Sequence, residues 1–206
     1  CIRDRYNPGA GTGGDQTKNF SYWSGMVTYC YEPLYGQLFS AIDYFAVAEG
    51  GTDLWQTANN KTWGSEVFHY EGLTTNTNYT NKLFKQAYSL INTCNSVIEV
   101  ASGVEGGNAT DVRILEGEAR CLRAYYYYLL VSNYGEISLI LNSSQDGAVL
   151  RPERSSYEAL YGQMVTDLTL ASQYLGKEPY NGDYARVTKK TALGLLARVY
   201  AQGAGE

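Results

Sequence analysis

The sequence predicts an all-α protein, built from stacked helix pairs that are joined by long irregular loops. Apolar residues recur every three or four positions through several long stretches, which is the pattern of amphipathic helices. Two of these helical stretches carry an Ala-Arg pair at comparable places, Ala119-Arg120 and Ala197-Arg198. Polar stretches without any helical period separate them. A single helix pair cannot bury its apolar face alone, so pairs of this kind stack on one another.

The composition favours one packed domain and excludes several kinds of function. Hydrophobic residues make up 44% of the 206-residue chain and charged residues 18%, so a folded core is expected. The formal net charge is −5 and no basic block occurs, so nucleic acid is not an expected partner. His69 is the only histidine and no Cys-x-x-Cys pair occurs, so no metal, no cofactor and no catalytic residues are predicted. Cys94 and Cys121 fall in helical patterns and are expected to be buried free thiols.

The beginning of the chain predicts a lipid anchor and a flexible leader. Cys1 is the residue that remains when a lipoprotein signal peptide is removed before its lipid-bearing cysteine, so lipidation is expected at Cys1. Residues 1–19 contain Pro8 and several glycines and have no period, as in a flexible tether. The helical domain is expected over residues 20–206.

Helices are predicted over residues 34–48, 79–101, 112–133, 157–175 and 188–201. Pro33 suits the first turn of the first helix, and Gly50-Gly51 should end it. Ser155 is expected to cap the fourth helix, in a capping box with Glu158. For the last helix, Thr188 is the expected N-cap and Gly203 the expected C-cap. Four residues should form the packed face of that helix: Leu193, Leu196, Ala197 and Tyr200.

The stretch from Ile114 to Leu141 carries the strongest helical signal, and Gly135 is expected to end its helix as a left-handed cap. Its apolar face is expected at Leu115, Ala119, Leu122, Tyr126 and Leu129. Glu116 and Arg120 are four residues apart, which suits an exposed ion pair on the helix flank. Together with Arg123 they are interpreted as ion pairs along and between helices of the scaffold, and not as a charged functional site.

Residues 50–78 form a long stretch rich in Gly, Asn and Thr, without a helical face. Long ordered loops in compact domains are usually functional. Trp55, Trp63 and Tyr70 offer flat apolar faces, and Asn59 and Asn60 offer amides, which together suit a sugar ring and its hydroxyls. These five residues are the predicted ligand-binding residues. In the alternative interpretation, the two tryptophans anchor the loop to the core.

Four motifs, in order along the chain, resemble those of the SusD/RagB-like outer-membrane lipoproteins. They are AEGGTDLW, LFKQAYSLINTCNSVIE, GEARCLRAYYYYLLVSNYGEISLIL and ARVTKKTALGLLARVY. Asp167-Leu168, Ala171 and Leu175 also match a helix of that family, whereas Ser138 stands where the family usually has proline. The resemblance implies a tetratricopeptide-like scaffold. Members of the family are generally more than twice this length, so the chain is expected to be an N-terminal part of a longer protein.

The resemblance also implies a function. Such proteins are lipid-anchored at the cell surface, on the outer membrane, and capture oligosaccharides without cleaving them. They deliver the glycan to a SusC-like TonB-dependent transporter, and part of their glycan site comes from the loop that here spans Asp53 to Tyr79.

Other functions stay open at this point. A RagB-like member would import peptides in place of glycans. A purely structural repeat protein would dock peptides independently of the loop tryptophans. A helical carbohydrate-active enzyme would need two carboxylates about 5 to 9.5 Å apart in a cleft. Asp43, Glu49 and Asp53 are the residues to consider for that pair, and spacing along the sequence does not give the distance between them.

Overall fold

The computed structural model describes residues 16–32, 34, 47–54, 65–74, 77–144 and 152–205, and the fold is given for these. Among them, β pairing is limited to one isolated parallel bridge, between Asn19 and Glu105. The prediction of an all-α protein is confirmed. The helices, in chain order, are η2 (Gln16–Lys18), α1 (Phe20–Tyr29), α3 (Ser65–His69), α4 (Asn78–Val100), η4 (Ala101–Gly103), α5 (Ala109–Tyr134), α6 (Tyr157–Tyr174), η6 (Tyr180–Gly182) and α7 (Lys189–Gly203).

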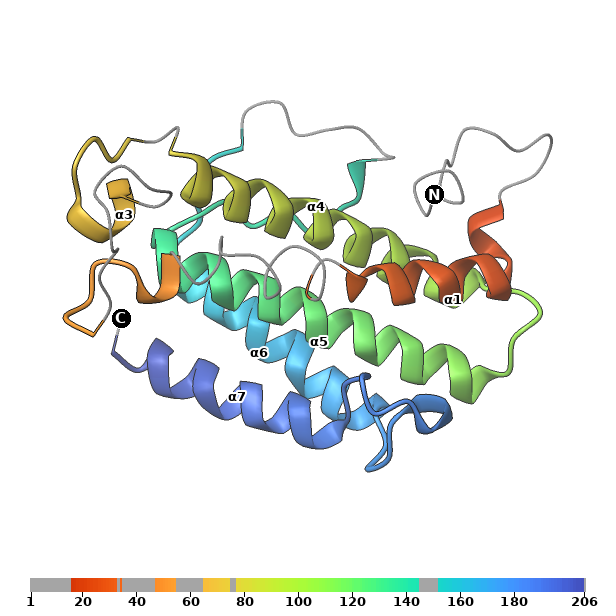
Figure 1. The fold of residues 1–206 in the computed structure, drawn as a ribbon. Coiled ribbons are helices and arrows are strands. Elements are labelled where there is room, and N and C mark those ends of the chain that lie inside the picture. Colours follow the sequence, from red (N-terminus) through yellow and green to blue (C-terminus); the bar gives the residue numbers. More distant parts are fainter. Residues whose placement is uncertain are drawn as a thin grey trace.

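The four long helices α4, α5, α6 and α7 lie side by side, and each runs antiparallel to the one before it (Figure 1). Helix α5 lies between α4 and α6, and α1 packs against α4 and α5. The predicted stack of helix pairs is therefore confirmed. Over the part of the chain that the structure describes, no helix combines the length and the apolar character needed to cross a membrane.

Helix α1 precedes the first helix that the sequence analysis predicts. Asn19 caps it, because its Oδ1 accepts hydrogen bonds from the backbone N–H groups of the second and third helical residues, at 3.0 and 3.3 Å. Trp23 fixes α1 to α4, since its indole N–H donates to the backbone oxygen of Val97 at 3.0 Å. The buried face recurs at helical spacing and consists of Trp23, Met26, Val27 and Cys30.

Two predictions about the N-terminal part fall largely outside the described residues. The predicted helix over 34–48 is described only at residues 34, 47 and 48, so it stays a prediction. Of the predicted leader, residues 1–15 lie outside the description, whereas residues 16–19 form η2 and the cap of α1.

Helix α5 begins three residues before its predicted start and has the predicted buried face. Asn108 caps it, with its Oδ1 accepting from the backbone N–H of Asp111 at 2.8 Å. Gly135 ends the helix at φ 71°, and its N–H donates to the oxygen of Val131 at 3.0 Å. The positive φ was predicted, but ψ is −140°, outside the left-handed helical region. All five predicted face residues are buried: Leu115, Ala119, Leu122, Tyr126 and Leu129.

The caps of α6 and α7 differ in detail from the prediction. Ser156, and not Ser155, caps α6 through a hydrogen bond from the N–H of Ala159 at 3.3 Å. Ser155 is engaged elsewhere, because its Oγ accepts from the N–H of Leu139 at 3.1 Å. Thr188 caps α7 as predicted, in a capping box with Thr191. Gly203 is the last helical residue of α7, and the cap is the residue after it.

The predicted packed face of α7 is wrong at Leu193, Ala197 and Tyr200, which are exposed, whereas Leu196 is half-buried and packs against the core. Leu193 is 47% exposed and Tyr200 57% exposed, whereas Ala192 and Val199 are buried. The physical reason is that α7 packs mainly on α6, and a close approach between the two helices favours small side chains at the contact. Leu193 and Tyr200 therefore face away from the core, whereas Leu195 and Leu196 pack partly against it.

After α5, the segment Ile137–Asn142 crosses the helices without regular secondary structure. Side chains bind several of its backbone polar groups. Tyr127 Oη donates to the oxygen of Ile140 at 2.7 Å and accepts from the N–H of Ile140 at 2.9 Å. Asn95 Nδ2 donates to the oxygens of Ile140 and Asn142, at 2.9 and 3.1 Å. Tyr88 Oη donates to the oxygen of Ser138 at 2.7 Å, which fixes the position where the family usually has proline.

Candidate ligand-binding site

Helix α3 lies at the end of the helix bundle, near the beginning of α4 (Figure 1), and Tyr70 directly follows it in the chain. Val67 of α3 is buried. Tyr70 has φ 57°, a left-handed conformation that is uncommon for residues other than glycine. Its side chain is 66% exposed. The backbone thus turns sharply at the residue that presents an aromatic ring to solvent.

The hydroxyl of Tyr70 is bound by the backbone 19 residues earlier in the chain. Tyr70 Oη donates to the oxygen of Gly51 at 3.2 Å. Gly51 has φ 74°, and a Cβ atom at this position would overlap the phenol of Tyr70. Only glycine suits both the conformation and the space. The contact therefore holds the two ends of segment 51–70 together and fixes the direction of the exposed ring.

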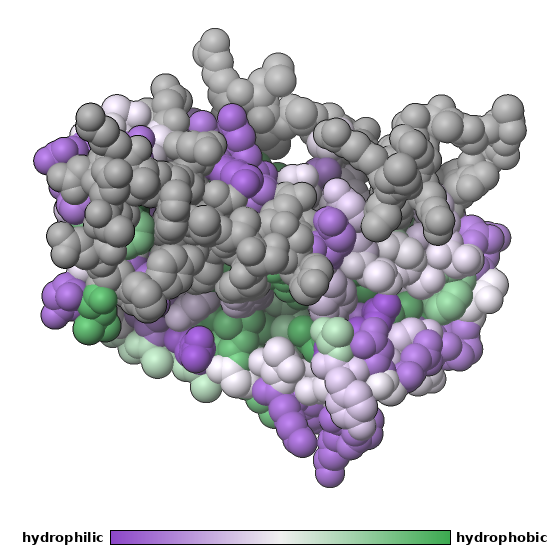
Figure 2. All heavy atoms as spheres, viewed as in Figure 1, coloured by the Kyte–Doolittle hydropathy of each residue, from purple (hydrophilic) through white to green (hydrophobic). Residues whose placement is uncertain are grey.

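Other apolar side chains flank this contact. Leu54 follows Gly51 by three residues and is 79% exposed, and Leu73 follows Tyr70 by three residues and is 46% exposed. Three residues of chain span at most about 11 Å, so both lie near the Tyr70–Gly51 contact. Hydrophobic and hydrophilic atoms adjoin at this end of the molecule (Figure 2). We call Leu54, Tyr70 and Leu73 the Tyr70 surface. Flat and apolar groups of this kind suit the C–H faces of sugar rings.

The other predicted ligand-binding residues are Trp55, Asn59, Asn60 and Trp63, and all four lie outside the described residues. They stay predictions, as does lipidation of Cys1. Of the three carboxylates considered for catalysis, Glu49 and Asp53 lie within the described residues and Asp43 lies outside them. Nowhere in the described ranges do three or more His, Cys, Asp or Glu side chains come together in a way that could hold a metal ion.

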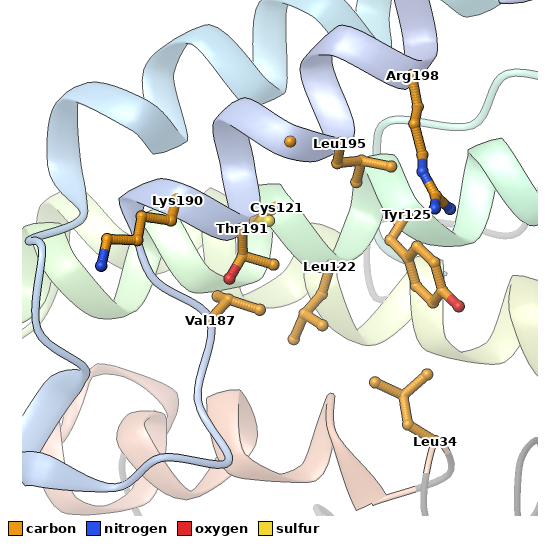
Figure 3. Close-up of a pocket in the computed structure, with 10 residues that line it drawn as sticks. Leu34, Cys121, Leu122, Tyr125, Val187, Lys190, Thr191, Leu195 and Arg198 are labelled. Carbon is orange, nitrogen blue, oxygen red and sulfur yellow. The ribbon is translucent and has the colours of Figure 1, made fainter.

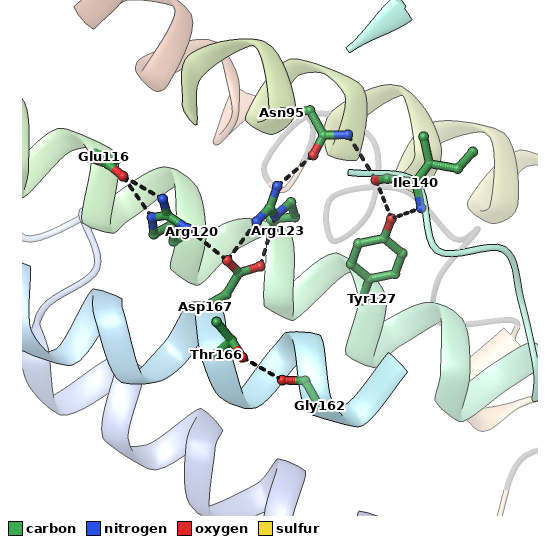
Figure 4. A network of polar contacts seen from close by, with 9 residues as sticks. All are labelled: Asn95, Glu116, Arg120, Arg123, Tyr127, Ile140, Gly162, Thr166 and Asp167. Atoms are coloured by element: carbon green, nitrogen blue, oxygen red, sulfur yellow. Dashed lines mark hydrogen bonds and ion pairs between the residues drawn. The ribbon is translucent and has the colours of Figure 1, made fainter. Parts of the chain in front are cut away.

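A buried network ties three helices of the bundle together (Figure 4). Arg123 Nε and Nη2 donate to Asp167 Oδ2 and Oδ1, at 2.8 and 2.7 Å, and join α5 to α6. Arg123 Nη1 donates to Asn95 Oδ1 at 2.9 Å, which adds α4. Burial alone lowers the pKa of Arg123, but the bonds and the attraction to Asp167 outweigh it, so the net shift is upward. Each guanidinium nitrogen of Arg123 thus has a protein acceptor.

Arg120 extends the same network toward the surface. Its Nε and Nη2 donate to Glu116 Oε1 at 2.8 and 2.7 Å, and its Nη1 donates to Asp167 Oδ1 at 3.2 Å. The interpretation of Glu116, Arg120 and Arg123 as scaffold ion pairs is confirmed. The side chains of Glu116 and Arg120 are only 16% and 17% exposed, less than the exposed flank that the spacing suggested.

A second buried network joins the turn after α1, helix α5 and the loop before α7. Glu118 is fully buried, and its Oε2 accepts from Arg186 Nη1 at 2.7 Å and from Tyr31 Oη at 3.0 Å. Tyr31 Oη also accepts from the N–H of Val187 at 3.2 Å. Within the described part of the chain, Glu118 Oε1 meets no hydrogen-bond partner. Burial raises the pKa of Glu118, and the opposing effect of Arg186 and Tyr31 is smaller.

A cavity of about 380 Å³ lies between α5 and α7 (Figure 3). Its walls are mainly hydrocarbon, from side chains such as Leu34, Leu122 and Leu195, with Lys190 and Arg198 at its edge. Cys121 also lines it, and burial raises the pKa of that thiol to about 12, so the thiol stays protonated at neutral pH. Cys30, Cys94 and Cys121 are free and buried, which confirms the prediction made for the last two.

Comparison with known proteins places the chain in a family. A SusD-like family model, described as starch-binding and associating with the outer membrane, matches residues 29–201. Among curated proteins, no match to the chain is found.

Solved structures share the fold. A SusD superfamily protein from Parabacteroides distasonis has a TM-score of 0.74 at 20% identity, and the match covers 89% of this chain and 40% of that one. Surface glycan-binding protein A from Bacteroides uniformis has a TM-score of 0.72 at 18% identity, with 90% and 44% covered. A laminarin-binding SusD-like protein has a TM-score of 0.71 at 19% identity, with 91% and 42% covered.

This chain therefore spans 40 to 44% of the length of these three structures. Their identities to it show a shared fold and no more. The family model covers most of the chain, from the last residue of α1 into the last turn of α7. On that match, the chain belongs to the SusD-like family.

Proposed function

We propose that this chain belongs to a cell-surface protein that binds glycans at the outer membrane and does not cleave them. The observation that carries the proposal is the match of residues 29–201 to a family described as starch-binding and associating with the outer membrane. Two of the similar structures are described as a laminarin-binding protein and a surface glycan-binding protein, which supports the same class of ligand.

The ligand contacts are proposed to come from the loop that contains the Tyr70 surface. The ring of Tyr70 offers an exposed apolar face in a fixed direction, because its hydroxyl is bound by Gly51. Trp55 and Trp63 add aromatic faces, and Asn59 and Asn60 add amides that bind sugar hydroxyls. Rigid aromatic side chains provide contact area at a low cost in conformational entropy.

The full-length protein is proposed to deliver the glycan to a SusC-like TonB-dependent transporter and to be held at the outer membrane by lipid on Cys1. One acyl chain alone gives only marginal membrane binding, so several chains on one cysteine suit a stable anchor. Intact-mass analysis of the native protein tests the anchor. Acyl mass on Cys1 is the expected result, and an unmodified Cys1 thiol contradicts the proposal.

Calorimetry on the full-length protein, with laminarin and starch as probes, tests glycan binding. Trp55→Ala, Trp63→Ala and Tyr70→Ala should each weaken binding by about 0.5 to 1.5 kcal/mol, by analogy with aromatic pair energies. Tyr184→Ala is the matched control. Tyr184 is also exposed, but it lies between η6 and the beginning of α7, outside the loop that is tested. Circular dichroism on each variant checks that helicity is unchanged. If all three loop variants bind like the parent protein, the site lies outside this loop.

The same samples distinguish the other functions. Release of reducing ends from laminarin or starch by the parent protein would establish an enzyme. Binding of peptides, with no binding of glycans, would favour a RagB-like function in peptide import. Peptide binding that is insensitive to the loop variants would favour a structural repeat protein.

A further inference from the structure

We infer that a disulfide bond joins Cys30 and Cys94 once the protein has been exported. Both thiols are free in the structure, and they lie together in the core. The inference rests on the proposed location at the outer membrane and adds a covalent link to it. The chain of an outer-membrane protein crosses the periplasm, a compartment in which disulfides form and persist.

The packing of α1 on α4 brings the two cysteines together. Trp23 sets the register, because its indole N–H donates to the backbone oxygen of Val97 at 3.0 Å. Cys30 follows Trp23 by seven residues, about two helical turns, and caps α1 with helical backbone angles, so it lies on the same face of α1. Cys94 precedes Val97 by three residues and shares its face of α4. Both cysteines are 0% exposed.

The two thiols are direct neighbours. A hydrogen bond joins the Cys94 thiol to the Cys30 thiol, and the pKa of Cys94 is raised by burial first and by this contact next. The Tyr126 hydroxyl of α5 lies beside both cysteines, since it donates to the backbone oxygen of Cys30 at 2.5 Å. After burial, Cys94 and Cys30 have the largest effects in raising the pKa of Tyr126. Cysteines that are held apart cannot be bridged without movement of the backbone, and these two are not held apart.

Cys121 is the other buried thiol of the described residues, and it is less well placed for a bond to Cys94. Burial, Glu118 and Asp167 raise the pKa of Cys121 more than Cys94 does, and Cys94 acts on it through charge alone. Cys121 also lines the cavity between α5 and α7. The structure therefore pairs Cys30 with Cys94 and leaves Cys121 as a thiol.

The bond forms by exchange with a disulfide of a periplasmic thiol oxidoreductase, which is the oxidant. One cysteine, as a thiolate, attacks that disulfide, which gives a mixed disulfide and releases one thiolate of the oxidoreductase. The second cysteine, as a thiolate, attacks the sulfur of the first and releases the other thiolate. The two cysteines thus lose two protons and two electrons, and the oxidoreductase becomes a dithiol.

The time of formation follows from burial. In the folded protein both thiols are closed off from solvent, and the raised pKa of Cys94 keeps its thiol protonated. The exchange therefore takes place before α1 and α4 pack. Once formed, the bond closes residues 30–94 into a covalent ring that contains the Tyr70 surface and the rest of the predicted ligand loop.

Peptide mapping of the full-length protein, isolated from outer membranes, tests the inference. Cells are quenched in acid, free thiols are blocked with N-ethylmaleimide in denaturant without reductant, and the digest is analysed by mass spectrometry. We expect two peptides joined through Cys30 and Cys94, lighter by two hydrogen atoms than the separate peptides, and Cys121 blocked by the reagent. Cys94→Ala should lose the joined peptides and leave Cys30 blocked. Cys121→Ala is the matched control, since it also removes a buried thiol and should keep them.

Thermal unfolding with and without a phosphine reductant gives a second readout. The parent protein and Cys121→Ala should melt about 5 °C or more lower in the reductant, because a disulfide that closes a long loop restricts the unfolded chain. The double variant Cys30→Ala, Cys94→Ala should melt at the same temperature in both conditions. An equal response of the double variant and the parent would contradict the inference.

The outcomes of the peptide map separate the two claims. If protein from the outer membrane has Cys30 and Cys94 both blocked, the disulfide is overturned while the proposed location stands. A bond from either residue to Cys121 or to another cysteine overturns it as well. If the protein is recovered only from the cytoplasm, with its thiols blocked, the location and the inference both fail. Joined peptides in outer-membrane protein, kept in Cys121→Ala and lost in Cys94→Ala, support both.

Discussion

Arg123 of α5 and Asp167 of α6 form a buried ion pair through two hydrogen bonds, of 2.8 and 2.7 Å. The Asp167 side chain is fully buried, and Arg120 and Arg123 both donate to it. Removing one partner of such a pair leaves a buried charge without compensation, which costs more than the intact pair contributes. The pair therefore matters for stability chiefly through the loss that follows when it is broken.

Asp167→Ala should lower the free energy of unfolding by about 3 to 5 kcal/mol, because Arg123 is left buried without its carboxylate. Urea unfolding followed by circular dichroism measures this. Glu116→Gln is the control, since Glu116 is partly exposed and forms a helix-flank pair that contributes at most about 1 kcal/mol. Equal costs for the two variants would contradict the burial argument.

Leu122→Ala should cost about 2 to 5 kcal/mol, because Leu122 is 2% exposed and lies against the cavity between α5 and α7. The deletion would enlarge that cavity. Leu193→Ala in α7 makes the same chemical change at a side chain that is 47% exposed, and should cost far less. Thermal and urea unfolding of the pair would show whether the structure identifies the buried leucine correctly. A smaller loss for Leu122→Ala than for Leu193→Ala is the contrary result.

Two glycines inside helices should respond to alanine in opposite directions. At Gly194 of α7 an added Cβ meets no atom within 4 Å, so Gly194→Ala should stabilise the protein by about 0.5 to 1 kcal/mol. At Gly117 of α5 the Cβ would lie 2.9 Å from Tyr174 Cβ, an atom fixed to the backbone of α6. Gly117→Ala should therefore cost about 1 to 3 kcal/mol. Melting temperatures that shift in the same direction would refute the assignment of these two environments.

Glu118 predicts a pH dependence whose sign follows from its raised pKa. The folded state holds a proton at pH values where an unfolded glutamate, with a pKa of about 4.3, has released it. The resulting stability is fully present below about 4.3 and is lost as the pH rises through the folded pKa. Glu118→Gln cannot titrate. The stability of the parent protein relative to this variant should thus increase as the pH falls from 7 to 4, as measured by urea unfolding. A difference that shrinks over this range would refute the prediction.

The sequence predicted most of the helical scaffold, because a helix with one buried face carries apolar residues at every third or fourth position. The buried face of α5 is the clearest case. Helix α1 carried the same signal, at Trp23, Met26, Val27 and Cys30 after the capping Asn19, but the aromatic residues throughout that stretch obscured it. For α7, apolar residues lie on more than one side of the helix. Periodicity alone cannot decide which of them faces α6.

Contacts between distant residues explain what the sequence could not give. Ser155 and Ser156 are equivalent as caps until Leu139 binds the first of them. The interhelix role of Arg120 and Arg123 was predicted, but Asn95 joins their network only through the packing of α4 on α5. In the candidate site, Tyr70 was predicted as a ligand residue, a role that still awaits a test. Its hydrogen bond to Gly51 joins residues 19 positions apart, and no local sequence pattern predicts that they meet.

The segment Ile137–Asn142 has a consequence for the behaviour of the protein at high concentration. Backbone N–H and C=O groups without partners can pair with a strand from another chain, which is how exposed edges promote aggregation. Here Tyr127 occupies both backbone groups of Ile140, and Asn95 and Tyr88 occupy neighbouring oxygens. Polar side chains from the helices thus take the place that a neighbouring strand would fill. The protection of this crossing against intermolecular β pairing therefore depends on side chains of α4 and α5, together with Ser155, which binds Leu139.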